Sequence, residues 1–193
     1  LSLSGTHGVE GLYGSGCQSG WLKGPGLEPL PPDTAVALVH AVNPWGFSWV
    51  RRVDADNIDI NRNAIDHTTP PPQNHDYRRV HDLLLPAVWD ARTADVLKGE
   101  LARLMGELGP RRVTRAITGG QYEYPDGVFY GGAAASWSCQ TLQALVAAHL
   151  GFARVIAVLD HHTGLGPQGH TEIICRHEPA TPALVRARAW WGA

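Results

Sequence analysis

Residues 154–164 read RVIAVLDHHTG and contain the strongest strand signal in the chain. Their first part is apolar and rich in β-branched residues, which is typical of a strand buried in a parallel sheet. Residues two apart on an extended segment share a face, so we expect Asp160 and His162 to point together and His161 to point away. A histidine directly after a buried strand is rigidly held, as a metal site requires.

Alternating strands and helices precede and follow this stretch. The sequence predicts further strands at 1–4, 35–40 and 171–175. It predicts helices at 8–21, 76–85, 93–108, 138–150 and 182–191, and a loop rich in glycine and tyrosine at 119–132. The alternation favours an α/β fold with a mixed, mostly parallel sheet flanked by helices. Open sheets of this class bind ligands beyond the carboxyl ends of their strands.

The composition is that of a globular protein. With 193 residues, the chain is long enough for one sizeable core, and we expect a single domain over 1–193. Hydrophobic residues make up 44% and charged residues 18%, which excludes a disordered chain and a coiled coil. We expect the seven tryptophans to lie in the core more often than to form a carbohydrate platform.

Charge and hydropathy exclude two classes of partner. The formal net charge is -2, and no basic cluster forms the footprint of a nucleic-acid-binding protein. No apolar run approaches the roughly 20 residues of a membrane span. We therefore expect neither nucleic acid nor membrane as a partner, and the sequence contains no signal for the oligomeric state.

The three cysteines, Cys17, Cys139 and Cys175, are odd in number and far apart. This predicts free thiols rather than a disulfide framework, and it favours a reducing, cytoplasmic compartment. The chain starts at Leu1 without Met and ends abruptly after 190–192, so we expect a fragment cut at both ends.

Residues 5–11 read GTHGVEG and form a first candidate metal motif. His7 and Glu10 are three apart and face the same way on a helical turn, and both residue types are good zinc ligands. With His162 they would make a set of two histidines and one carboxylate, which leaves a coordination position for water. Spacing alone also allows two other interpretations. Residues 5–11 could be a polar turn at the end of a strand, and residues 161–162 could be a surface histidine pair that caps a strand.

Residues 59–62, DINR, form a further candidate site. The planar guanidinium of Arg62 suits a carboxylate, and Asn61 can add a donor. Asp59 could accept the second ring N–H of a ligand histidine. An Asx-rich turn with a surface arginine is the alternative.

These motifs, in this order, resemble the zinc carboxypeptidase superfamily, which includes succinylglutamate desuccinylase and aspartoacylase. Residues 7–10 match its His-x-x-Glu zinc motif, 59–63 match Asp-x-Asn-Arg-Asn, and 160–164 match a strand-end Asp-x-His-Thr-Gly. The resemblance covers most of the chain. The stretches 40–47 (HAVNPWGF), 120–122 (GQY), 125–132 (PDGVFYGG) and 163–167 (TGLGP) are similar to a bacterial family of carboxypeptidase-like proteins of unassigned function.

The resemblance implies a zinc centre. In it, His7, Glu10 and His162 bind Zn²⁺, and Asp59 orients His7 from behind. The implied reaction is attack by zinc-activated water on an amide carbonyl, with zinc acting as Lewis acid.

The resemblance also implies the substrate class, a small peptide or an acyl-amino acid. Asn61 and Arg62 would hold the terminal carboxylate of this substrate. Arg51 or Arg52 would polarise the scissile carbonyl, and the sequence does not distinguish these two. We therefore expect a metallocarboxypeptidase-like hydrolase.

One part of the implied machinery is not found in this sequence. The general base of the superfamily is a glutamate well downstream of the third ligand, whereas only Glu172 and Glu178 follow His162 here. We expect that the C-terminal part of the fold is missing and that hydrolysis is impaired, because a lost general base costs about 10²–10⁴-fold. The alternatives are an N-acyl amino-acid deacylase of the aspartoacylase type, a non-catalytic zinc-binding module, and a protein without a metal.

Overall fold

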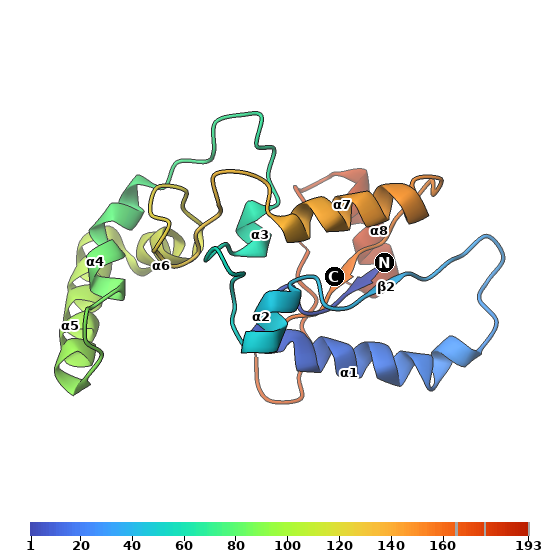
Figure 1. Cartoon of the computed structure of the whole chain (residues 1–193), viewed down its shortest axis with the longest axis horizontal. Helices are drawn as coiled ribbons and strands as arrows, with labels where there is room; N and C mark the ends of the chain where they lie inside the picture. Colours follow the sequence, from blue (N-terminus) through green and yellow to red (C-terminus); the bar gives the residue numbers. More distant parts are fainter. Residues whose placement is uncertain (165, 176, 193) are drawn as a thin grey trace. The chain divides into compact units, whose positions relative to one another are not determined.

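Figure 1 shows the computed structural model of the chain, which describes residues 1–164, 166–175 and 177–192. The chain divides into two compact units, Leu1–His162 and Thr163–Ala193. Every candidate site residue named above belongs to the first unit. The prediction of a single domain over 1–193 stays a prediction.

A small parallel sheet forms the centre of the first unit. Its strands are β1 (Ser2–Leu3), β2 (Leu38–Val39) and β3 (Leu159–Asp160), in the order β2-β1-β3. β1 pairs in parallel with both neighbours, so the carboxyl ends of all three strands share one edge of the sheet. This confirms the α/β class, with a sheet that is entirely parallel and much smaller than expected.

The strands are shorter than the apolar runs that predict them. Of the predicted strand 35–40 only Leu38–Val39 is paired, and of 154–160 only Leu159–Asp160. The prediction of a strand at 171–175 is wrong, because this segment has no regular structure and both Ile173 and Ile174 are more than half exposed. A strand needs a neighbour for its N–H and C=O groups, and no described residue provides one there.

Helices make up most of the regular structure. In the part of the chain that is described, they are α1 (Gly11–Leu22), α2 (Pro44–Trp49), α3 (Ile60–Asn63), α4 (His81–Leu84), α5 (Ala91–Leu108), α6 (Pro110–Thr118), α7 (Trp137–Leu150) and α8 (Pro182–Trp191). Three short 3₁₀ helices lie at Gly8–Glu10, Pro25–Leu27 and His75–Arg79.

Helices α1, α5, α7 and α8 begin and end within three residues of the predicted positions. Asp90 and Thr93 form a reciprocal capping box at the start of α5, and Ser136 caps α7. Helix α6 is not among the predicted helices, although Gly109 and Pro110 mark the end of α5. The same pair also starts α6, since proline fits the first position of a helix, where its missing N–H has no partner to lose.

Two apolar clusters hold the first unit together. One cluster joins the sheet to α3 and α7, and its buried members are Leu3, Val42, Ile60 and Cys139. The second lies among α4, α5, α6 and the 3₁₀ helix before α4, and its buried members are Tyr77, Val80, Leu104 and Val113. The first cluster fixes α3 against β1 and α7, so it positions the motif 59–63 relative to the end of the sheet.

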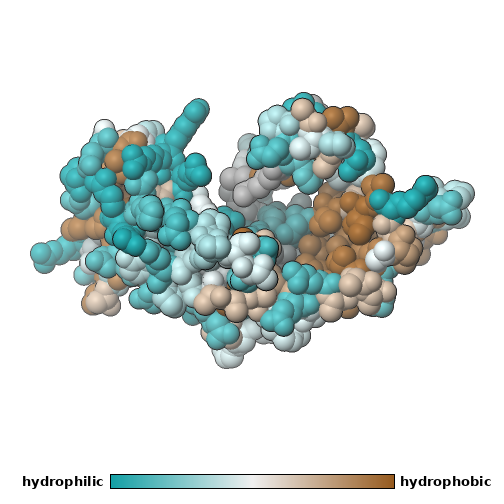
Figure 2. Space-filling view, turned by 90° about the horizontal axis from the view of Figure 1, so that it is seen from above, coloured by the Kyte–Doolittle hydropathy of each residue, from teal (hydrophilic) through white to brown (hydrophobic). Residues whose placement is uncertain are grey.

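The expectation that the tryptophans form the core is wrong. Six of the seven are at least 36% exposed, namely Trp45, Trp49, Trp89, Trp137, Trp190 and Trp191. They lie in short helices, at helix ends or in a turn, where so large a ring is only partly covered. Figure 2, a view from above, shows that other apolar residues, in brown, also reach the surface.

The three cysteines agree with the expectation of free thiols. Cys17, Cys139 and Cys175 are free. Within the described ranges, no helix combines the length and the apolar character that a membrane crossing requires.

Candidate metal centre

His7 lies in the turn that follows β1 at the carboxyl edge of the sheet. This turn is held by two backbone hydrogen bonds, from Val42 N to Ser4 O at 3.0 Å and from Asn43 N to Gly5 O at 2.9 Å. The side chain of His7 is therefore rigidly placed, and the residue is only 3% exposed.

Glu10 is brought to the same edge by the 3₁₀ helix Gly8–Glu10. This helix packs closely on α2: a Cβ atom on Gly8 would lie 1.9 Å from the carbonyl carbon of Gly46. Only glycine permits so close an approach of two backbones. Gly8 thus sets the distance between α2 and the 3₁₀ helix that connects His7 to Glu10.

His162 follows β3 and completes the group. Its Nδ1 lies 2.7 Å from Oε2 of Glu10, and its Nε2 lies 2.9 Å from Oδ2 of Asp160. The ring centroids of His7 and His162 are 5.0 Å apart. The predicted alternation after the strand is confirmed, because Asp160 and His162 are bonded to each other whereas His161 bonds Ser2 instead.

His7, Glu10 and His162 can hold a metal ion. One ligand atom from each of these residues lies within 4.8 Å of the others. Nδ1 of His7 is buried and has no hydrogen-bond partner, which costs free energy unless a bound group satisfies it. Two imidazole nitrogens and one carboxylate oxygen suit zinc and several other divalent metals.

The two histidines differ in their affinity for protons. The hydrogen bonds to Asp160 and Glu10 raise the pKa of His162 from 6.5 to about 9. Burial lowers the pKa of His7, against the opposing charge of Asp59. In the metal-free protein at neutral pH, His162 is therefore protonated between two carboxylates and His7 is neutral. A metal ion binds only the unprotonated ring, so it would displace the proton of His162.

Asp59 is fully buried behind this group. Its carboxylate caps α3 by accepting from Arg62 N, and its Oδ2 accepts from Arg52 Nε at 3.0 Å. Asp59 acts on His7 through its charge. The described hydrogen bonds of the Asp59 carboxylate go to these two arginines, so the predicted orientation of His7 by Asp59 stays a prediction.

The structure separates the two candidate arginines. Arg52 pairs with Asp59, and its guanidinium lies 4.8 Å from the ring centroid of Phe129. The charge of Arg52 also contributes to lowering the pKa of His7, which places it at the site. Arg51 is exposed, and its backbone N–H bonds Gly46 O at the end of α2.

Asn61 and Arg62 also reach the metal group or its surroundings. Nδ2 of Asn61 lies 3.4 Å from Nε2 of His7 and 3.3 Å from Nε2 of His162. Arg62 donates from Nε and Nη2 to the carbonyl of Thr118, and its guanidinium lies 5.6 Å from the Phe129 ring. The structure thus brings Asn61 to both histidines, and it holds Arg62 against Thr118 and Phe129.

Three residues that support the site have no predicted role. Asp160 bonds His162, and Thr6 donates to the other oxygen of Asp160 at 2.8 Å. Asn63 is buried and ties the end of α3 to the loop before α7, through Gly131 O, Ala134 O and Ser136 N. The shared face of residues 160 and 162 is a signal for Asp160, and the match of residues 59–63 to Asp-x-Asn-Arg-Asn is a signal for Asn63. No local pattern indicates Thr6.

The fold and the site together define a mixed α/β protein with a candidate metal centre of two histidines and one glutamate. A family model described as "Protein of unknown function (DUF2817)" matches residues 1–193, and the chain belongs to this family. Comparison with curated proteins and with solved structures gives no match.

Proposed function

We propose that this chain holds the metal ligands and substrate-binding residues of a zinc-dependent hydrolase that cleaves an amide bond next to a free carboxylate, as in the zinc carboxypeptidase superfamily. The observation that carries the proposal is the convergence of His7, Glu10 and His162, with the buried Nδ1 of His7 lacking a partner. These residues come from two strand ends far apart in the sequence.

The ligands are supported from behind by hydrogen bonds. A zinc ion bound by the three residues would supply a Lewis acid and lower the pKa of water toward neutrality. Asp160 accepts from Nε2 of His162, which leaves Nδ1, the nitrogen that faces Glu10, for the metal. Thr6 in turn holds Asp160. This chain of contacts fixes the ring orientation of His162 before any ligand binds.

Positive charge beside the metal group supports a substrate with a carboxylate. Arg52 and Arg62 both lie against the ring of Phe129, at 4.8 and 5.6 Å, and Asn61 adds an amide donor. Guanidinium groups bind carboxylates through paired N–H donors. Because Arg52 rather than Arg51 approaches the site, we assign to Arg52 the role of polarising the scissile carbonyl.

Zinc content tests the centre directly. Elemental mass spectrometry of protein purified without chelator is expected to find about one zinc per chain. His162→Ala is expected to lose the metal, whereas His161→Ala, the matched control one residue away, is expected to keep it. Circular dichroism would show that both variants are folded. Zinc absent from the folded wild type, or retained in His162→Ala, would overturn the proposed centre.

Substrate panels test the reaction and separate the alternatives. With zinc bound, we expect slow release of the C-terminal residue from dipeptides with a free carboxylate, since the expected loss of the general base costs about 10²–10⁴-fold. The same dipeptides amidated at the C-terminus should not be cleaved. Faster cleavage of N-acetyl or N-succinyl amino acids would instead indicate a deacylase. Stoichiometric zinc without even slow turnover of any of these compounds would indicate a non-catalytic zinc-binding module.

A further inference from the structure

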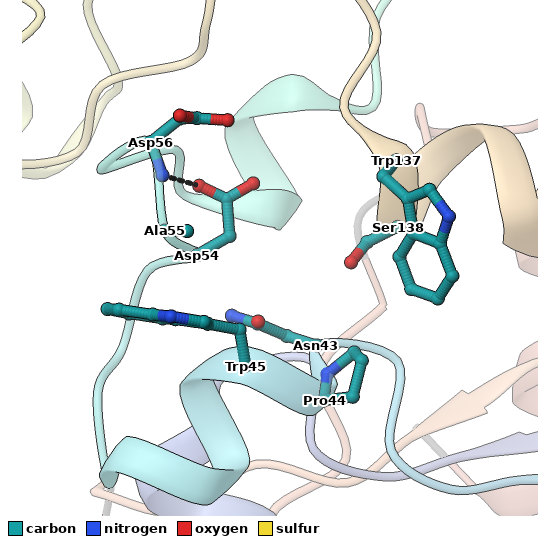
Figure 3. A pocket seen from close by; sticks show the side chains of 8 residues that line it. All are labelled: Asn43, Pro44, Trp45, Asp54, Ala55, Asp56, Trp137 and Ser138. Carbon is teal, nitrogen blue, oxygen red and sulfur yellow. Dashed lines mark hydrogen bonds between the residues drawn. The ribbon is translucent and has the colours of Figure 1, made fainter.

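A second concave site lies among α2, the turn that precedes α3 and the start of α7 (Figure 3). The cavity has a volume of about 140 Å³, roughly ten times the 10–15 Å³ that a single water needs. None of the residues lining it belongs to the metal group or to its carboxylate site. It is therefore large enough for a small ligand and has no role in the function proposed above.

The floor of this cavity contains an unsatisfied donor. Asn43 is fully buried, and its Oδ1 accepts from Gly46 N at 2.8 Å, which caps α2. Its Nδ2 has no hydrogen-bond partner. Figure 3 shows this amide nitrogen turned toward the space beneath Asp54. A buried amide donor left unpaired is unfavourable, so the site is suited to receive an acceptor oxygen.

The opposite wall offers groups of complementary polarity. Oδ1 of Asp54 accepts from the N–H groups of Asp56 and Ile58, at 3.0 and 2.9 Å. Figure 3 shows the other oxygen of Asp54 turned toward Ser138, whose hydroxyl also faces the cavity. Partial burial raises the pKa of Asp54, as it does for a carboxylate drawn away from water. The cavity thus presents one donor, one acceptor and one hydroxyl that can do either.

Two tryptophans provide the apolar part of the lining. Trp45 forms one side beside Asn43, and Trp137, the first residue of α7, forms another. They are 39% and 66% exposed. Indole rings exposed beside a few fixed polar groups are typical of a binding site for a small molecule with an apolar face.

The chemistry of this lining selects one class of ligand. Asp54 and Asp56 disfavour anions, and the lining contains no arginine, lysine or histidine. A simple ammonium ion would leave the donor of Asn43 unpaired. A peptide that binds by adding a strand through its main chain needs a strand edge, and the lining has no strand. A sugar ring satisfies all of these groups, because its hydroxyls both donate and accept while its C–H face lies against indole.

We propose that this cavity, called here the Trp45–Trp137 site, binds a neutral saccharide unit. Its acceptor oxygen would take the hydrogen bond of Asn43, one hydroxyl would donate to Asp54, and the ring face would pack on Trp45. The proposal is independent of the zinc centre and holds for the protein with or without metal.

Titration with methyl glycosides of glucose, mannose, galactose and N-acetylglucosamine tests the site. Indole N–H resonances of isotope-labelled protein are recorded as each compound is added to about 50 mM, which detects millimolar affinity. The indole signals of Trp45 and Trp137 are assigned from Trp45→Phe and Trp137→Phe. We expect both to shift and saturate with at least one glycoside.

Matched variants keep the outcome clear. Trp137→Ala is expected to weaken binding at least tenfold, whereas Trp89→Ala, 65% exposed and outside the cavity, leaves it unchanged. Asp54→Asn keeps the acceptor for Asp56 and Ile58 and replaces the other oxygen by a donor, so it is also expected to weaken binding about tenfold. The absence of a saturable shift with all four glycosides, or saturable shifts with tetramethylammonium alone, would overturn the proposal.

Discussion

The substitution Asn63→Asp is expected to destabilise the first unit strongly although it changes a single group. Asn63 is 1% exposed and donates from Nδ2 to the carbonyls of Gly131 and Ala134, both at 2.8 Å. Its Oδ1 accepts from Ser136 N, also at 2.8 Å. An introduced carboxyl keeps the acceptor for Ser136 and removes both donations.

The expected loss follows from those two donations. Each buried partner left without its hydrogen bond costs about 1–3 kcal/mol, so the free energy of unfolding should fall by about 2–6 kcal/mol. Domains of this size are stable by only about 5–15 kcal/mol. The introduced carboxylate would also face two carbonyl oxygens in a buried place, which raises its pKa above the usual value. The destabilisation should therefore be smaller near pH 5 than at pH 8, because a protonated carboxyl can restore one donation.

Urea unfolding followed by tryptophan fluorescence measures this loss. Asn57→Asp is the matched control, because Asn57 makes the same kind of double donation, to Pro125 O at 2.8 Å and Gly127 O at 2.9 Å, in a half-exposed place. There water replaces the lost partners, and we expect a loss under about 1 kcal/mol. Equal losses for the two variants would refute the reasoning that burial sets the cost.

Four further predictions concern the metal centre and the packing. Because the pKa of His162 is raised to about 9, the apparent zinc affinity should rise about tenfold per pH unit up to that pH. Chelator competition measures this affinity, and a profile that does not change with pH would show that His162 is not a ligand. In chelator-treated protein, the stability that His162 contributes should be present below pH 6.5 and lost as the pH rises through about 9. Urea unfolding across that range measures this loss, and a free energy of unfolding that stays constant would contradict it. Gly8→Ala should lower the free energy of unfolding by about 3 kcal/mol or more, because the new Cβ meets the backbone of Gly46. Gly16→Ala, in the open part of α1, should be neutral or stabilising. Similar melting temperatures for the two variants would count against the close contact. Leu104→Ala should cost about 2–5 kcal/mol in thermal or urea unfolding, since this side chain is 1% exposed, and a smaller loss would mean that the cluster around it repacks.

Local sequence signals predicted much of the framework. The helices at α5, α7 and α8 were predicted because apolar spacing, capping residues and glycine or proline stops all act within a few residues. The strands were overestimated for the opposite reason. An apolar run shows that a segment can be a strand, but pairing depends on a neighbour elsewhere in the chain, which 171–175 does not have among the described residues.

Spacing along the chain was enough to propose the composition of the candidate metal centre, since His7 and Glu10 lie three apart and His162 follows a strand. Whether these three residues meet depends on tertiary contacts, because β1 and β3 lie side by side and end at the same edge. Tertiary contacts also hold Arg52, rather than Arg51, against Asp59, place Asp160 and Thr6 behind His162, and bring Trp45 and Trp137 to one cavity. Local spacing sets only the direction of neighbouring side chains, whereas contacts between distant segments depend on how the sheet and helices pack.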